Sequence, residues 1–204
     1  LVIRAPRMAL VKVSVIDFAQ KITELLTEEI SVSPEGVLQL SEKQDLAYLM
    51  VFNRYGLSGK GTGVIKNFGM TGGAVASTVS HDSHNLTVVF RNVDDAVTAI
   101  NSLIDHNGGL SVCIGGRIAT VELPVGGLIS ELPAPELAAA LNEFEQLYCQ
   151  AFGGKQVSLL RVVTTSLIVS PKFKVSDKGI VDVLEQKLVP LFPDFPDFKP
   201  MSTI

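Results

Sequence analysis

Five consecutive polar residues separate two apolar runs near the middle of the chain. The stretch GGAVASTVSHDSHNLTVVF spans residues 72–90, and its polar centre is His81, Asp82, Ser83, His84 and Asn85. Histidine changes its charge near neutral pH, so a carboxylate between two imidazoles suits proton transfer, the orientation of a water molecule or metal binding. A solvated hairpin end is the alternative, because Asp, Asn and Ser side chains hydrogen-bond to the backbone in turns.

Spacing argues against two specific kinds of site in this motif. In an extended chain, neighbouring side chains point to opposite faces, so no three residues of 81–84 converge on one ion. We therefore expect the motif to hold no metal. Ser83 lacks the G-x-S-x-G pattern of a hydrolase nucleophile, and the third histidine of the chain, His106, falls at a predicted helix end.

Strands and helices on both sides of the motif must position it. Apolar patterns predict strands at residues 10–16, 46–54, 74–80, 86–90 and 157–169, and a hairpin at 110–123. Helices are predicted over 92–107, with Asn92 as the N-cap, and over 134–152. Residues 22–32 fit a short helix or a strand equally well.

Strands outnumber helices in this pattern, and they come partly as hairpins. The sequence therefore predicts an α+β fold: a mixed, largely antiparallel β-sheet with two or more helices packed on it. No Pro/Ser-rich linker divides the chain, so we expect a single domain over 1–204. Its end, 193–204, is rich in proline and phenylalanine and is predicted to be an irregular tail.

A second notable segment is GLSGKGTG, residues 56–63, with four glycines in eight positions. The phosphate-loop spacing GxxxxGK[ST] is absent, which makes phosphate binding the minor alternative. We predict a loop whose glycines let the backbone come close to another part of the structure.

Composition excludes several classes of partner. The chain is 47% hydrophobic with a formal net charge of −4, so it offers no broad basic surface to nucleic acid or acidic lipid. No apolar run reaches the roughly 18 residues of a membrane span. Cys113 and Cys149 have no metal-ligand spacing, so we expect free thiols in a reducing compartment, with a disulfide as the minor alternative. A cytoplasmic location is expected.

Three quoted stretches resemble one known family. GTGVIKNFGMTGGAVASTVSHDSHN, residues 61–85, is similar to a run of the C-terminal domain of bacterial and archaeal adenine deaminases, of the amidohydrolase superfamily. LPVGGLISELP, 123–133, and KVSDKGIVDVLEQKLVPLF, 174–192, continue the resemblance in the same order. Tyr55 stands where that family often has histidine, which leaves open a diverged relative with another substrate.

The resemblance implies a metal-dependent hydrolase that converts adenine and water to hypoxanthine and ammonia. In that family an N-terminal barrel carries two divalent metal ions, expected to be Mn or Fe. This chain has only three histidines and begins at Leu1, so we expect it to be the C-terminal part of such an enzyme, without the metal centre.

The resemblance also suggests roles for the polar motif. It would help to close the active site at the barrel mouth, with His81, Asp82 and His84 as catalytic residues and Ser83 and Asn85 binding the purine base. The expected partners are the barrel and the purine, with a homodimer as a further possibility. Two alternatives stay open: a stand-alone small-ligand-binding module, and a structural or dimerisation domain.

Overall fold

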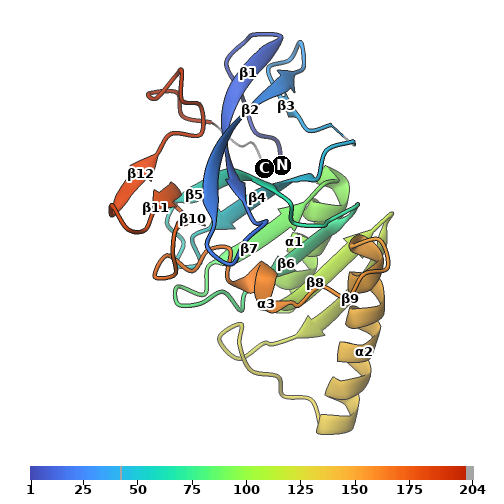
Figure 1. Ribbon diagram of the computed structural model, residues 1–204. Coiled ribbons are helices and arrows are strands. Elements are labelled where there is room, and N and C mark those ends of the chain that lie inside the picture. The colour runs from blue at the N-terminus through green and yellow to red at the C-terminus, as the bar shows by residue number, and fades with distance from the viewer. Residues whose placement is uncertain (42, 201–204) are drawn as a thin grey trace.

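A nine-stranded sheet forms the body of the molecule (Figure 1). The computed structural model describes residues 1–41 and 43–200. The strands of this sheet are β1 (Leu10–Asp17), β2 (Glu24–Val32), β3 (Leu38–Gln39), β4 (Leu46–Phe52), β5 (Lys60–Lys66), β6 (Ala74–Ser77), β7 (Leu86–Phe90), β8 (Gly109–Ile114) and β9 (Arg117–Glu122). Their spatial order is β3-β2-β1-β5-β4-β7-β6-β8-β9. Within the described chain β1 and β5 pair in parallel and the other neighbours pair antiparallel.

Helices cover the part of the sheet that carries the polar motif. Helix α1 (Val93–Asp105) contacts β6, β7, β8 and β9, and helix α2 (Ala134–Ala151) contacts β8 and β9. A short third helix, α3, spans Leu160–Val163. The predicted α+β fold is confirmed, including the largely antiparallel sheet and the helices packed on it.

The start of α1 is held as its sequence predicts. The Asn92 side chain accepts a hydrogen bond from the Asp95 N–H at 2.9 Å, which satisfies one of the amides that a helix start leaves open. The buried Asp95 carboxylate in turn accepts hydrogen bonds from the amides of Gly115 and Gly116. Both glycines have positive φ, as the predicted two-residue turn between β8 and β9 requires.

The glycine-rich segment differs from its prediction. Gly61 and Gly63 lie inside strand β5, not in a loop. A second sheet of β10 (Phe173–Ser176), β11 (Gly179–Asp182) and β12 (Lys187–Val189) contacts β5. A Cβ atom on Gly61 would lie 1.7 Å from the Ser176 carbonyl oxygen. The glycines therefore do permit close approach, but the approaching element is the β10–β11 hairpin.

Residues 157–169 were predicted to be a strand, and that prediction is wrong. The segment forms α3 and turns, although it is rich in β-branched residues. Val162 and Val163 are buried, and the Arg161 guanidinium donates hydrogen bonds to the carbonyls of Phe18 and Asn67. Contacts made over long sequence distances have overridden a local preference for strand. The ambiguous stretch 22–32 is largely strand β2.

The chain runs on past β12 without further helix or strand up to residue 200. An irregular tail was expected over residues 193–204. Of these, residues 201–204 lie outside the described residues. None of the helices in the described ranges is both long and apolar enough to cross a membrane.

Candidate functional site

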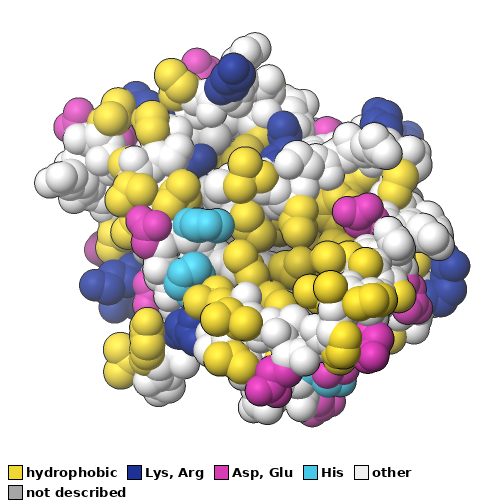
Figure 2. Space-filling view, turned by 90° about the horizontal axis from the view of Figure 1, so that it is seen from below, with side chains coloured by type: hydrophobic (Ala, Val, Ile, Leu, Met, Phe, Trp, Pro, Cys, Tyr) yellow, Lys and Arg dark blue, Asp and Glu magenta, His cyan; other side chains and the backbone are white. Residues whose placement is uncertain are grey.

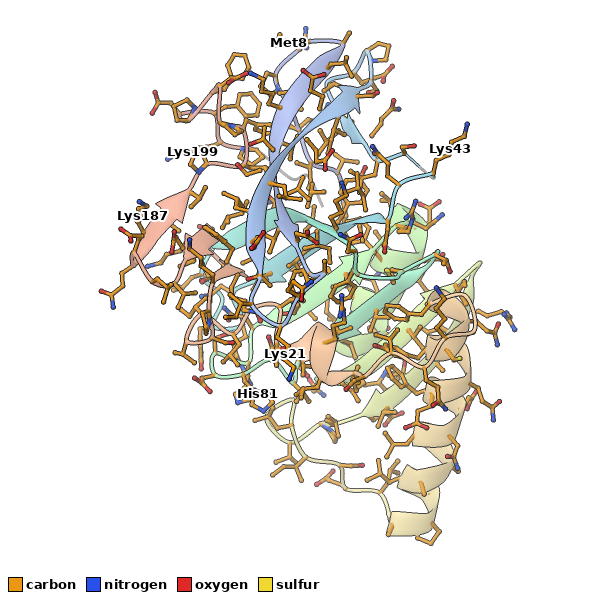
Figure 3. The ribbon with its side chains drawn as sticks, in the orientation of Figure 1. Met8, Lys21, Lys43, His81, Lys187 and Lys199 are labelled. Atoms are coloured by element: carbon orange, nitrogen blue, oxygen red, sulfur yellow. The ribbon has the colours of Figure 1, made fainter. Side chains whose placement is uncertain are left out.

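The five polar residues form a tight turn between β6 and β7. The His84 N–H donates to the Ser80 carbonyl oxygen at 2.6 Å, and His84 has a φ of 51°. The His81–Asp82 peptide bond is cis. The side chains of His81, Asp82 and Ser83 are exposed, and that of His84 is half-buried. In Figure 3, His81 lies at the left-hand side of the molecule, well above the lower end formed by α2.

The two imidazoles lie on the same side of this turn. Their ring centroids are 5.9 Å apart, because the chain curls back at this point and is not extended. The Nδ1 atom of His84 accepts a hydrogen bond from the Ser80 N–H at 3.4 Å. In the neutral imidazole the proton therefore belongs on Nε2, which can donate to a group outside the chain.

The other polar residues of the motif have different surroundings. The Asp82 carboxylate has neither a hydrogen-bond nor an ion-pair partner within the described chain, so both oxygens are open to an incoming group. The Ser83 hydroxyl accepts a hydrogen bond from the Asn85 N–H at 3.3 Å. Asn85 is buried, and its Oδ1 accepts the Arg54 N–H at 3.2 Å. Asn85 thus joins the turn to the end of β4.

A buried cluster of three hydroxyl groups lies under the turn. Ser80 Oγ is 2.8 Å from Thr87 Oγ1 and also hydrogen-bonds to Ser166 Oγ, which is 3.2 Å from Thr87 Oγ1. Each of these hydroxyls can donate and accept, so the three satisfy one another without water. Ser166 comes from the segment after α3, and the cluster therefore fixes that segment against the base of the turn.

Arg54 holds the opposite side of the turn. Its guanidinium donates to the His84 carbonyl oxygen at 3.4 Å and to the Gly126 carbonyl oxygen at 2.6 Å. Next to it, the Thr78 hydroxyl donates to the Gly127 carbonyl oxygen at 2.7 Å. The loop that follows β9 is thereby tied to both ends of the turn. Arg54, Thr78, His84 and Gly127 help to line a cavity of about 200 Å³.

Sequence reasoning did not identify Arg54, Thr78 or Ser166 as neighbours of the motif. Arg54 and Ser166 are remote from the motif in sequence, whereas Thr78 lies shortly before it. The one available signal was that the loop 123–133 falls in a stretch that resembles the same family as the motif. Only the sheet order, which brings the ends of β4, β6 and β9 together, shows that they meet.

We expect Arg54→Ala to loosen the turn without unfolding the protein. Because the guanidinium is exposed, the free energy of unfolding should change by less than about 1 kcal/mol. Amide hydrogen exchange over residues 78–90 should become about tenfold faster, since the bonds to His84 and Gly126 are lost. Arg117→Ala, which removes an exposed arginine of β9, is the matched control. Unchanged exchange over 78–90 in the Arg54 variant would contradict this role.

Potential metal ligands do not cluster in the described ranges. No three or more His, Cys, Asp or Glu side chains within 1–41 and 43–200 are grouped so that they could hold a metal ion. Both cysteines are free thiols. Burial, with a contribution from the neighbouring Asp95 carboxylate, raises the pKa of Cys113 to about 11, so this thiol is unreactive near neutral pH.

A second, larger cavity, of about 940 Å³, lies elsewhere. It runs between α2 and residues 156–159, and its lining includes Leu141, Phe144, Tyr148 and Leu159. None of the residues 81–85 lines it. The motif is thus a turn beside a small cavity, with three exposed side chains and the half-buried His84 imidazole, which helps to line that cavity. Such an arrangement can offer a proton donor and an acceptor to a group brought up from outside.

Comparison with known proteins adds to this geometry. A family described as adenine deaminase C-terminal domain matches residues 20–187. Adenine deaminase 2 of Shouchella clausii is 40% identical over 169 residues, which are 81% of this chain and 29% of that protein. Adenine deaminase 1 of Carboxydothermus hydrogenoformans is 36% identical over 84% of this chain and 29% of its own length. The adenine deaminase of Thermosipho melanesiensis is 35% identical over 82% of this chain and 30% of its own length.

The chain therefore spans about 30% of the length of the curated relatives that it matches. The region matched by the family, residues 20–187, contains the elements that surround the turn. It includes β5, the turn between β6 and β7, the loop after β9 and the β10–β11 hairpin.

Proposed function

The chain belongs to the adenine deaminase C-terminal domain family, and we propose that it is the C-terminal domain of an enzyme that hydrolyses adenine to hypoxanthine and ammonia. The observation that carries this proposal is the outward-facing turn His81–Asn85, which the family match includes. The fold positions the polar groups of this turn, and Asp82 has no hydrogen-bond or ion-pair partner within the described residues. A site that is shared with another surface requires such an open group.

We propose distinct roles for the residues of the turn. Hydrolytic deamination takes a proton from water and gives one to the purine ring or the leaving amine, so it needs an acceptor and a donor near the base. The open Asp82 carboxylate would accept, and Nε2 of His84 would donate. The His81 ring would form the edge of the site, since its centroid lies 5.9 Å from that of the His84 ring. Ser83 and Asn85 would support the purine base, Asn85 chiefly by holding the turn in place.

The rest of the active site would lie on an N-terminal barrel of the amidohydrolase type. Divalent metal ions, Mn or Fe, would be held on that barrel, as the resemblance to the family implies; within residues 1–41 and 43–200 no three His, Cys, Asp or Glu side chains are grouped to hold a metal ion. The role proposed for this domain is to close the site over the purine and to supply the proton-transfer groups of the turn.

The 204-residue chain by itself is expected to fold and to show no adenine deamination. It has a large buried core, including Phe90, Val75 and Leu49, but lacks a group of metal ligands in its described residues. The full-length enzyme should release ammonia from adenine and lose this activity to a chelator. Ammonia release and hypoxanthine formation by both proteins provide the test. Adenine turnover by the purified 204-residue chain, or none by the metal-loaded full-length enzyme, would overturn the proposal.

A further inference from the structure

Two apolar segments border the turn, and hydrogen bonds fix both of them to it. The first is the loop after β9, joined through Arg54 and Thr78 to the turn. The second follows α3 and is joined through Ser166 to Ser80. The exposed hydrophobic side chains of these segments, called the apolar rim below, are Val125, Leu128, Ile129, Leu132, Ile168 and Val169.

The apolar rim is almost free of charge. Residues 123–133 contain one charged residue, Glu131, and residues 162–171 contain none. Figure 2 shows this underside of the molecule, where hydrophobic side chains gather in a hollow beside two histidines and most charged side chains lie around the edge. Single exposed hydrophobic residues are ordinary, but a gathering of them on one face marks a surface that another one covers.

The exposed fractions of individual side chains support this reading. Ile129 is 61% exposed and Val169 is 69% exposed, although both are large aliphatic residues that globular proteins usually bury. They lie in loop segments whose neighbours, Gly127 and Ser166, are buried and hydrogen-bonded. The backbone of the rim is therefore held in place while its hydrophobic side chains face solvent.

We propose that the apolar rim is the surface by which this domain docks on the N-terminal part of its own polypeptide, so that the turn His81–Asn85 enters the interface. This inference rests on the proposed function for its choice of partner. The relatives are more than three times the length of the region that matches them, so most of the polypeptide remains available as the occupant. A partner on the same chain is present at an effective concentration of about millimolar, at which a rim of modest area is sufficient.

The position of the rim also fits the chemistry assigned to the turn. The two apolar segments of the rim lie on two sides of the turn. A surface that covers both segments would therefore exclude water from the space over Asp82 and His84. Excluding water strengthens hydrogen bonds and charge interactions at a reacting group. The rim would thus set the distance between the turn and the base, while the turn itself supplies the polar groups.

Thiol labelling of the full-length enzyme tests the docking surface directly. Ile129→Cys and Val169→Cys place a thiol on the rim. Leu184→Cys is the matched control, because Leu184 is 64% exposed in the turn between β11 and β12. Figure 3 shows Lys187, at the start of β12, far from His81. Cys149 is replaced by alanine in all three variants, and Cys113 stays because it is buried.

The three thiols should react at similar rates with a maleimide in urea. In the folded full-length enzyme, the two rim thiols should react at least about tenfold more slowly than the control, because they are reached only after local opening. Equal rates at all three positions would overturn the proposal. Protection of the rim that disappears on dilution would also overturn it, since a second copy would then be the occupant.

The labelling result and the activity are independent measurements. A full-length enzyme with a protected rim but no adenine turnover would retain the docking surface and refute the proposed function. An active enzyme whose rim thiols react as fast as the control would retain the function and refute the docking surface.

Discussion

Asp82→Asn in the full-length enzyme is expected to lower kcat/KM for adenine by about 10²- to 10⁴-fold, the usual cost of losing a positioned proton-transfer group. The substitution keeps the shape of the side chain and removes its ability to accept a proton. Since the Asp82 side chain is exposed and unpaired, the free energy of unfolding should change by less than about 0.5 kcal/mol. Metal content should be unchanged. Steady-state kinetics, metal analysis and urea unfolding make the measurement.

The same experiment separates the residues of the turn. His84→Ala should cost at least as much as His81→Ala, because only His84 has a ring nitrogen fixed by a backbone amide. Ser83→Ala should cost less, since water can replace an exposed hydroxyl. Asp105→Asn, at the exposed end of α1, is the control and should behave as the unmodified enzyme. Near-normal kinetics in every turn variant would leave the turn as a packing element, and a lower metal content in a histidine variant would assign it a metal.

Gly61→Ala is expected to be the most destabilising of the glycine substitutions in β5. The new Cβ would lie 1.7 Å from the Ser176 carbonyl oxygen and 2.8 Å from the Gly179 nitrogen, both of them backbone atoms that cannot turn aside. The β10–β11 hairpin would have to move off the sheet. We expect a loss of at least about 3 kcal/mol in the free energy of unfolding, well above an ordinary glycine replacement.

Two neighbouring glycines provide graded controls for this prediction. A Cβ on Gly63 would lie 2.8 Å from the Val175 Cγ2 atom, and one on Gly59 would lie 3.1 Å from the Asp177 Oδ2 atom. The Gly63 contact is with one methyl group of the buried, β-branched Val175 and not with backbone, so Gly63→Ala should cost less than Gly61→Ala. The nearest contact of Gly59 is a carboxylate end that can rotate, so Gly59→Ala should cost least of all. Urea unfolding of the 204-residue chain measures all three. Equal and small losses would show that the hairpin does not need this close approach.

Local patterns in the sequence were enough for much of the secondary structure and for the fold class. The N-cap of α1 depends on Asn92 alone, and the β8–β9 turn depends on two adjacent glycines, so each could be predicted from a few residues. The motif at 81–85 was visible because its residue types are unusual between two apolar runs. Its family was also visible, since the order of three separate stretches matched.

The sequence alone could not show which surfaces come together. Gly61 looks like a loop residue until the β10–β11 hairpin, more than 100 positions later, is seen to pack against it. Residues 157–169 have the composition of a strand, but the contacts of Arg161, Val162 and Ser166 with remote segments make them a short helix and turns. In both cases the deciding energy comes from contacts between residues far apart in the chain.

The candidate site divides along the same line. Residue types determined that positions 81–85 could transfer a proton, because imidazole and carboxylate groups have that chemistry in any fold. Tertiary structure decided that His81 and His84 face the same side, that Asn85 is turned inward to Arg54, and that two apolar segments flank the turn. The physical reason is that side-chain direction at a turn is set by hydrogen bonds to neighbouring strands and loops, and the sheet order determines which of those are near.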